Sequence, residues 1–198
     1  MATKEYRCVQ RTKQALQDAF VQLSVSRPEE KITVKRLCEQ AGLSRNAFYF
    51  HYGDLEELFS EIETGILDEM RARLVELERI GFPENVLGAI NALTEIVLQN
   101  RTVCEMLMSP AYYTAFSEKT FEIFSNFNYR YFQKYNRTTS REVFDFYYTF
   151  LSDGFWGMLR RYMKSGEAFP QEKFTALCYT FIKRLLMPNE PSLSFLNA

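Results

Sequence analysis

A short segment near the N-terminus concentrates side chains whose chemistry suits contact with nucleic acid. After Ser44 the chain reads RNAFYFHY, and a helical period places Ala47, Phe48 and Tyr52 on one buried side. The other side carries four side chains that can donate hydrogen bonds to phosphates and base edges: Arg45, Asn46, Tyr49 and His51. The pattern predicts a helix that lies in the major groove of DNA.

A second short helix is expected just before this one, joined to it by a tight turn. Thr33 is suited to cap its start, and apolar residues then recur at helical spacing: Val34, Leu37, Cys38 and Ala41. Gly42 follows, and glycine enters the left-handed backbone region without a Cβ clash. Leu43 fills the angle between the helices, and Ser44 caps the second one. Residues 32–52 therefore predict a helix-turn-helix.

A third helix is expected to precede this pair. It is predicted to begin at Arg11-Thr12-Lys13, with a buried stripe made of Ala15, Leu16, Ala19, Phe20 and Leu23. The turn is Ala41-Gly42-Leu43-Ser44, and the aromatic run is Phe48-Tyr49-Phe50-His51-Tyr52. With these features in this order, residues 7–60 resemble the N-terminal part of the tetracycline-repressor (TetR) family of bacterial transcription regulators.

The resemblance implies an all-α fold with a three-helix helix-turn-helix DNA-binding domain in residues 1–53 and an α-helical ligand-binding and dimerisation domain in residues 54–198. It also implies a homodimer that binds a palindromic operator in double-stranded DNA, acts as a repressor, and is released by a small-molecule ligand. The DNA contacts that it implies are Arg11, Thr33, Lys35, Ser44, Arg45, Asn46, Tyr49 and His51.

One position departs from the pattern of the family. Where relatives carry a lysine that binds a DNA phosphate, this chain has Leu55, and Asp54, Glu56 and Glu57 add carboxylates nearby. Loss of one cation weakens an electrostatic footprint without abolishing it. An alternative therefore stays open, in which a TetR-fold regulator or co-activator has lost DNA binding and acts through a protein partner or a ligand.

The distribution of charge agrees with DNA binding by the N-terminal segment. The whole chain of 198 residues has a net charge of −1, but residues 1–53 hold nine Lys and Arg against five Asp and Glu, and residues 54–198 hold fifteen against twenty. A hydrophobic content of 46% is enough for a full core. The basic segment is expected to face phosphates, and the acidic remainder is expected to avoid them.

Catalytic and metal-binding chemistry find little support in the sequence. The four cysteines are scattered singly, so buried thiols in a reducing, cytoplasmic compartment are expected, and His51 is the only histidine. We predict no metal, no cofactor and no enzymatic activity, because no GxSxG, Walker or Rossmann glycine motif occurs. No segment has the apolar length of a signal peptide or a membrane span.

The remaining sequence predicts further helices. A long helix from Asp54 to Glu78 should bury Leu58, Ile62, Ile66, Met70, Leu74 and Leu77, and should end at Gly81-Phe82-Pro83. Later helices are predicted over residues 86–100, 117–135, 140–164 and 170–186, and a tail is predicted over 189–198.

The helix predicted over residues 140–164 has two apolar faces. The first is a wide core stripe that includes Phe144, Tyr148 and Leu151, and the second comprises Val143, Phe146, Phe150, Gly154 and Gly157. A helix with two apolar faces needs two partners. The second partner is either another helix of the same chain or, with the helix over 170–186, the second subunit of a dimer.

Aromatic residues are dense in the C-terminal part, and the chain holds 18 Phe and 12 Tyr. Such side chains fill cores and also line ligand cavities. If the body encloses a cavity for a small apolar or aromatic ligand, the predicted lining residues are Tyr112, Phe124, Tyr147 and Trp156.

Overall fold

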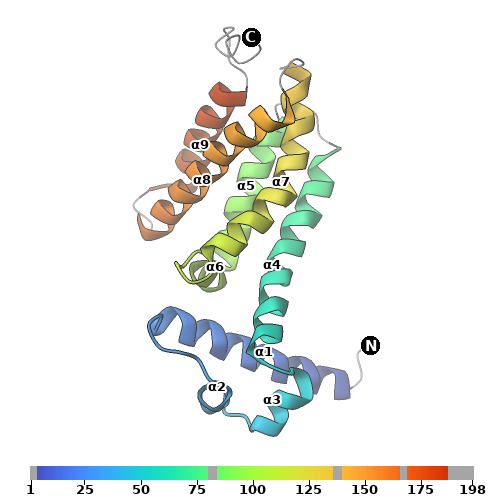
Figure 1. The fold of residues 1–198 in the computed structure, drawn as a ribbon, viewed down its shortest axis with the longest axis vertical. Helices are drawn as coiled ribbons and strands as arrows, with labels where there is room; N and C mark the ends of the chain where they lie inside the picture. Colours follow the sequence, from blue (N-terminus) through green and yellow to red (C-terminus); the bar gives the residue numbers. More distant parts are fainter. Residues whose placement is uncertain (1–3, 80–83, 136–139, 166–168, 187–198) are drawn as a thin grey trace. The chain divides into compact units, whose positions relative to one another are not determined.

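The structure is a computed structural model that describes residues 4–79, 84–135, 140–165 and 169–186. These residues form α-helices joined by short connections, and no strand occurs among them, so the all-α prediction is confirmed. The helices are α1 (Lys4–Ser26), α2 (Val34–Ala41), α3 (Arg45–His51), α4 (Leu55–Leu77), α5 (Glu84–Gln99), α6 (Arg101–Leu107), α7 (Tyr113–Tyr135), α8 (Arg141–Ser165) and α9 (Gln171–Leu186) (Figure 1). The expected helix end at Gly81-Phe82-Pro83 and the expected tail lie outside the described residues.

The chain packs as two compact units. The N-terminal unit comprises the chain up to Ile66 together with Asn100–Tyr113, and the C-terminal unit comprises Leu67–Gln99 and the chain from Thr114 onward. The packing therefore divides within α4, and it places α6 with the helices of the N-terminal unit. The expected domains, 1–53 and 54–198, were divided at Gly53, where the helix-turn-helix sequence ends.

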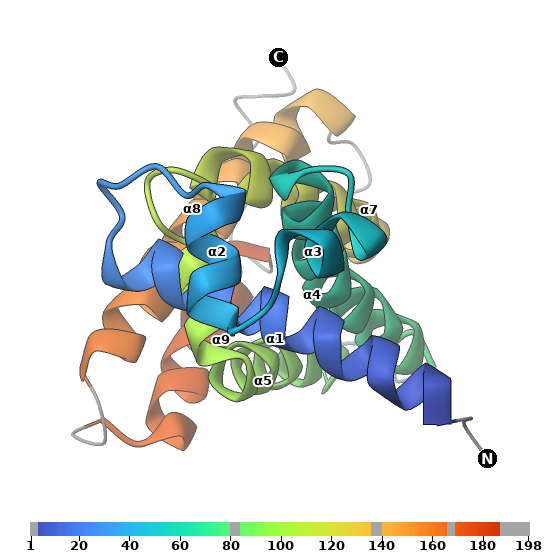
Figure 2. The ribbon, with the colours of Figure 1, turned by 90° about the horizontal axis from the view of Figure 1, so that it is seen from below.

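The core of the N-terminal unit is built on α1. Its stripe of Leu16, Ala19, Phe20 and Leu23 is buried, and α1 packs against α2, α3 and α6. Figure 2 shows α2 and α3 on the same side of α1. The predicted start at Arg11 was wrong, because α1 already begins at Lys4. No proline or glycine interrupts residues 4–10, so nothing in them stops a helix. Cys8 and Val9 lie seven positions, about two helical turns, before Ala15 and Leu16 of the predicted stripe, so the apolar spacing already extended past Arg11.

The C-terminal unit has an aromatic core. The rings of Phe144 and Tyr148 stack at 5.4 Å between centroids, and Phe132 lies 5.1 Å from Phe144. Helix α9 packs against both α5 and α8. The helices α4 and α5 approach closely in this unit, since a Cβ added at Gly88 would lie 2.6 Å from a methyl carbon of Leu77.

The apolar stripe predicted for α4 is confirmed along its whole length. All six of its residues are buried: Leu58, Ile62, Ile66, Met70, Leu74 and Leu77. The first three belong to the N-terminal unit and the last three to the C-terminal unit. One continuous helix therefore contributes to both cores.

Candidate nucleic-acid interface and regulatory cavity

The ends of α2 and the start of α3 are held by the local hydrogen bonds that the sequence predicts. The Thr33 hydroxyl accepts the Arg36 backbone N–H, and the Ser44 hydroxyl accepts the Ala47 backbone N–H. Gly42 has a φ of 66°, in the left-handed region. Its N–H donates to the Glu39 carbonyl, and the next N–H, that of Leu43, donates to the Cys38 carbonyl at 2.9 Å, which is a Schellman motif. These bonds fix where α2 begins and ends and where α3 begins.

Helix α3 is held in place by its two buried aromatic side chains. Phe48 is 0% exposed and Tyr52, which ends the helix, is 2% exposed. Their rings lie 5.9 Å apart, and Tyr49 meets Phe48 edge to face at 5.3 Å. Because α3 has only seven residues, this packing rather than helix propensity must hold it in shape.

A polar network joins the end of α3 to α1 and α4. The Gln17 side-chain amide donates to the Tyr52 hydroxyl and to Glu61, both at 3.2 Å. Lys13 pairs with Glu61 at 2.7 Å, and its ammonium lies 5.3 Å from the centre of the Tyr52 ring. Burial raises the pKa of Tyr52 to about 12, so the phenol stays neutral at ordinary pH. The network fixes the orientation of α3 within the N-terminal unit.

The outward face of α3 carries the predicted base and phosphate contacts. Arg45 and Asn46 are exposed, Tyr49 is 58% exposed, and His51 is half-buried. One residue on this face was missed by the sequence reasoning: Phe50 is 79% exposed. It follows Asn46 by four residues, so helical spacing alone could have placed it there.

The remaining predicted DNA contacts also lie at the surface of the N-terminal unit. Thr33 and Ser44 are exposed cap residues whose hydroxyl protons stay available for donation to a phosphate. The Lys35 side chain is 66% exposed and lies 3.8 Å from Glu39, a surface pair that holds it only weakly. Arg11 is exposed on α1.

The acidic residues around Leu55 have a structural role. The Asp54 carboxylate accepts the Glu57 backbone N–H at 2.8 Å, and the Glu57 carboxylate accepts the Gly53 backbone N–H at 2.7 Å. Together these two bonds cap the start of α4. Leu55 itself is half-buried. The two carboxylates therefore stabilise the helix start, while they keep negative charge beside the position where the family carries lysine.

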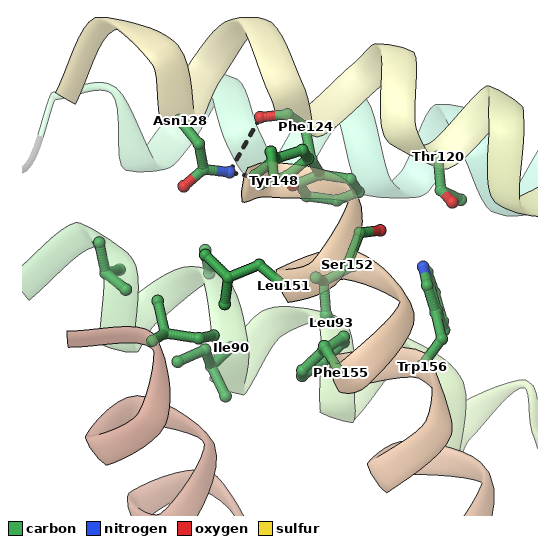
Figure 3. A pocket seen from close by; sticks show the side chains of 13 residues that line it. Ile90, Leu93, Thr120, Phe124, Asn128, Tyr148, Leu151, Ser152, Phe155 and Trp156 are labelled. Carbon is green, nitrogen blue, oxygen red and sulfur yellow. Dashed lines mark hydrogen bonds between the residues drawn. The ribbon is translucent and has the colours of Figure 1, made fainter. Parts of the chain in front are cut away.

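A small cavity lies within the C-terminal unit between α5, α7, α8 and α9 (Figure 3). Its volume is about 60 Å³, and its walls include Ile90, Leu93, Phe155 and Trp156. Every residue that lines it is uncharged. A cavity of about 150 Å³ is needed to hold benzene, so a ligand of that size requires the walls to move apart.

One end of the cavity is polar. The Asn128 amide donates to the Tyr148 hydroxyl at 3.2 Å and to the Phe124 carbonyl at 2.9 Å (Figure 3). Burial raises the pKa of Tyr148 far above its usual value, so its hydroxyl remains protonated. Ser152 also lines the cavity. A neutral ligand with one hydroxyl or carbonyl group would find both donors and acceptors here.

The four residues predicted to line a ligand cavity are separated by the fold. Phe124 and Trp156 line this cavity, but Tyr147 does not. Residue 148 lies about 100° further round the helix, and there Tyr148 takes the place beside the cavity, while the Tyr147 ring packs 5.6 Å from Phe132. Tyr112 belongs to the N-terminal unit, where its ring stacks on Phe59 at 4.6 Å.

Other kinds of site are not found in the described part of the chain. No group of three or more His, Cys, Asp or Glu side chains is placed to hold a metal there. Three of the cysteines, Cys38, Cys104 and Cys178, are buried as predicted, and Cys8 is exposed. Within the same ranges, no helix combines the length and the apolar character that crossing a membrane requires.

Comparison with known proteins identifies the C-terminal part. Residues 84–184 match a TetR-type family model described as "Transcriptional regulator C-terminal region". No match was found among curated protein sequences. The fold of the chain is that of helix-turn-helix transcription regulators, and the chain belongs to the TetR family. Because this family is not enzymatic, the protein is a regulator and not an enzyme.

Solved structures share this fold along nearly the whole chain. A TetR-like transcriptional regulator from Rhodococcus sp. RHA1 is 16% identical with a TM-score of 0.70, and the match covers 93% of this chain and 97% of that one. A TetR family regulator from Marinobacter aquaeolei VT8 is 15% identical with a TM-score of 0.63, covering 89% and 95%. The TetR family regulator PfmR from Thermus thermophilus is 17% identical with a TM-score of 0.58, covering 96% and 99%.

Proposed function

We propose that this regulator is a homodimeric repressor that binds a near-palindromic operator, with residues 44–52 of each protomer in the major groove of one half-site. The observation that carries the proposal is the outward face of α3, which presents polar side chains on a helix fixed by buried Phe48 and Tyr52. A recognition helix of this kind reads base edges while its neighbours bind the backbone. A protein of this function works where the chromosome lies, in the cytoplasm.

The contacts divide by chemistry. Arg45 and Asn46, in the first turn of α3, are assigned to bases, because guanidinium and amide groups form paired hydrogen bonds with guanine and adenine. Tyr49 and His51 are assigned to phosphates. Residues outside α3 are assigned to the DNA backbone beside the groove: Arg11, Thr33, Lys35 and Ser44.

The homodimer is assigned to α8 and α9. Phe146 and Phe150 on α8 are 75% and 71% exposed, and Leu177 and Phe181 on α9 are 42% and 48% exposed. A Cβ added at Gly154 would meet no atom within 4 Å, so within the described residues no helix of the same chain crosses there. The partner of this second face was expected to be either another helix of the same chain or a second subunit. The open space at Gly154 favours the second subunit. Adjacent exposed aromatic side chains mark an interface more often than a free surface.

Control by a small apolar or aromatic ligand is assigned to the cavity lined by Phe124 and Trp156. Its uncharged lining favours a neutral molecule. Such a ligand must enlarge the cavity to enter, and α4 extends from the C-terminal unit into the N-terminal unit as one helix. Reciprocity requires that a ligand which releases DNA binds the DNA-bound dimer more weakly by the same factor.

A second function is favoured by the surface around Leu55. Asp54 and Glu56 are exposed carboxylates next to the position where the family carries a phosphate-binding lysine. A TetR-fold regulator that acts through a protein partner or a ligand, without DNA, would tolerate this charge. The repressor is expected to bind one DNA duplex in preference to others, whereas the regulator without DNA binding is expected to prefer none.

Gel retardation of the DNA upstream of the protein's own gene, at low salt, tests the proposal. Wild-type protein is expected to retard one fragment in preference to others. Lys35→Ala should weaken binding to all sequences alike, whereas Arg45→Ala should reduce the difference between good and poor sites. If folded dimer retards no fragment from this region or from the rest of the genome, the function without DNA takes its place.

A further inference from the structure

The outward face of α3 contains an apolar side chain that the assigned hydrogen-bond contacts do not use. Phe50 is 79% exposed, more than any other large hydrophobic side chain among those the structure describes. Its neighbours Phe48 and Tyr52 supply the buried side of the helix, so the core does not require Phe50. It lies one turn after Asn46, which is assigned to a base, and next to Tyr49.

The surroundings of this face offer fewer cations for binding phosphates than the pattern of the family does. Leu55 replaces a cation, and Asp54 and Glu56 are exposed nearby. Lys35 lies 3.8 Å from the carboxylate of Glu39. A phenyl ring pressed against a phosphate would remove water from the anion and return no hydrogen bond, which is unfavourable.

We infer that Phe50 reads a thymine in each half-site by packing against its C5-methyl group. That methyl group is the apolar feature which an unmodified base pair presents in the major groove, and only A·T pairs carry it. The ring of Phe50 meets that of His51 edge to face at 5.0 Å, with an interplanar angle of 88°, so it has less rotational freedom to lose on binding. The inference rests on the proposed DNA binding and adds one element of the sequence that the protein prefers.

The test changes the DNA and leaves the protein intact. In the fragment that wild-type protein retards, each thymine of the protected site is replaced in turn by deoxyuridine, which lacks only the methyl group. At one thymine per half-site, wild-type affinity is expected to fall about fourfold for each methyl group lost, the value for one buried CH₂. Other thymines are expected to have little effect.

The matched variant is Phe50→Ala. It should bind the thymine duplex no more tightly than wild-type protein binds the deoxyuridine duplex, and the same deoxyuridine replacement should leave its affinity unchanged. Val75→Ala, which shortens a 61% exposed side chain on α4, should respond to deoxyuridine as wild-type protein does. The two changes, Phe50→Ala in the protein and deoxyuridine in the DNA, form a double-mutant cycle. The coupling free energy of this cycle measures the contact separately from any effect of Phe50 on folding.

The outcomes separate this inference from the function on which it rests. If wild-type protein and Phe50→Ala lose the same affinity at every deoxyuridine, Phe50 does not read a methyl group, and the inference is overturned while the operator stands. Uniform weakening by Phe50→Ala, without coupling to any thymine, would place the ring against sugars or at another protein, and would overturn it equally. If no fragment is retarded, the proposed function itself fails.

Discussion

Shortening Phe150 to alanine is expected to weaken the dimer without unfolding the subunit. In the isolated chain this side chain is 71% exposed, so it contributes little to the packing of its own subunit. Substitutions of exposed residues away from caps and ion pairs change stability by about 0.5 kcal/mol or less. A loss of dimerisation would therefore report the interface and not a damaged core.

The size of the effect follows from the exposure. Complete burial of a Phe side chain stabilises by about 1.5–3 kcal/mol, and roughly seven-tenths of the Phe150 side chain remains to be buried, about 1–2 kcal/mol. A twofold interface contains each residue twice, so Phe150→Ala should cost about 2–4 kcal/mol per dimer. The dimer dissociation constant should rise about 30- to 700-fold.

Sedimentation equilibrium over a range of protein concentrations measures this constant directly. Val75→Ala is the control, because Val75 is 61% exposed on α4 and lies outside the assigned interface. We expect a wild-type dimer at micromolar concentration, an unchanged Val75→Ala and a weakened Phe150→Ala with a retained helical spectrum. An equal dissociation constant for all three, or a wild-type monomer, would refute the assignment to α8 and α9.

Substitutions at three further positions test other features of the N-terminal unit. Leu55→Lys should tighten operator binding and steepen its salt dependence by about one unit per half-site, as measured by titration at several salt concentrations; unchanged affinity and slope would show that this helix start lies away from the phosphates. Gly42→Ala should lower the free energy of unfolding in urea by about 1–2 kcal/mol and Gly42→Asn by less, because φ is 66° there; an equal loss for both would point to a cause other than the left-handed backbone. The raised pKa of Tyr52 means that its unfolded form ionises first, so wild-type stability should be full below pH 10 and fall as the pH rises toward 12. In unfolding experiments, Tyr52→Phe should lack the loss of stability between pH 10 and pH 12 that comes from this phenol. An identical pH profile of stability for both proteins would contradict the burial argument.

The helix-turn-helix was predictable because local interactions define it. The caps at Thr33 and Ser44 and the left-handed Gly42 depend on residues no more than four positions away, and the structure confirms each of them. The buried stripe of α4 was predictable for a related reason, since a regular apolar period leaves one orientation for the helix. The start of α1 was placed too late. Cys8 and Val9 continue the apolar spacing, but Tyr6 is the only apolar side chain in residues 4–7, so the period fades before the helix begins.

The lining of the cavity depended on packing that periodicity does not determine. Tyr147 and Tyr148 both fall within the wide apolar stripe of α8, and only the position of Phe124 and Phe132 on α7 decides which of them faces the cavity. Tyr112 was misplaced because the chain returns to the N-terminal unit through α6 before α7 begins. The spacing of apolar residues along the sequence does not show which unit α6 and Tyr112 pack against.

Selection from a pool of random DNA duplexes by the wild-type protein tests the central claim most directly. After several rounds and sequencing, we expect an enriched near-palindrome whose half-site centres are about 10 base pairs apart or a multiple of that, as a twofold dimer of recognition helices requires. Arg45→Ala, assayed in parallel, should enrich a more degenerate sequence. Folded, dimeric wild-type protein that enriches no sequence above the starting pool at low salt would contradict DNA reading by α3.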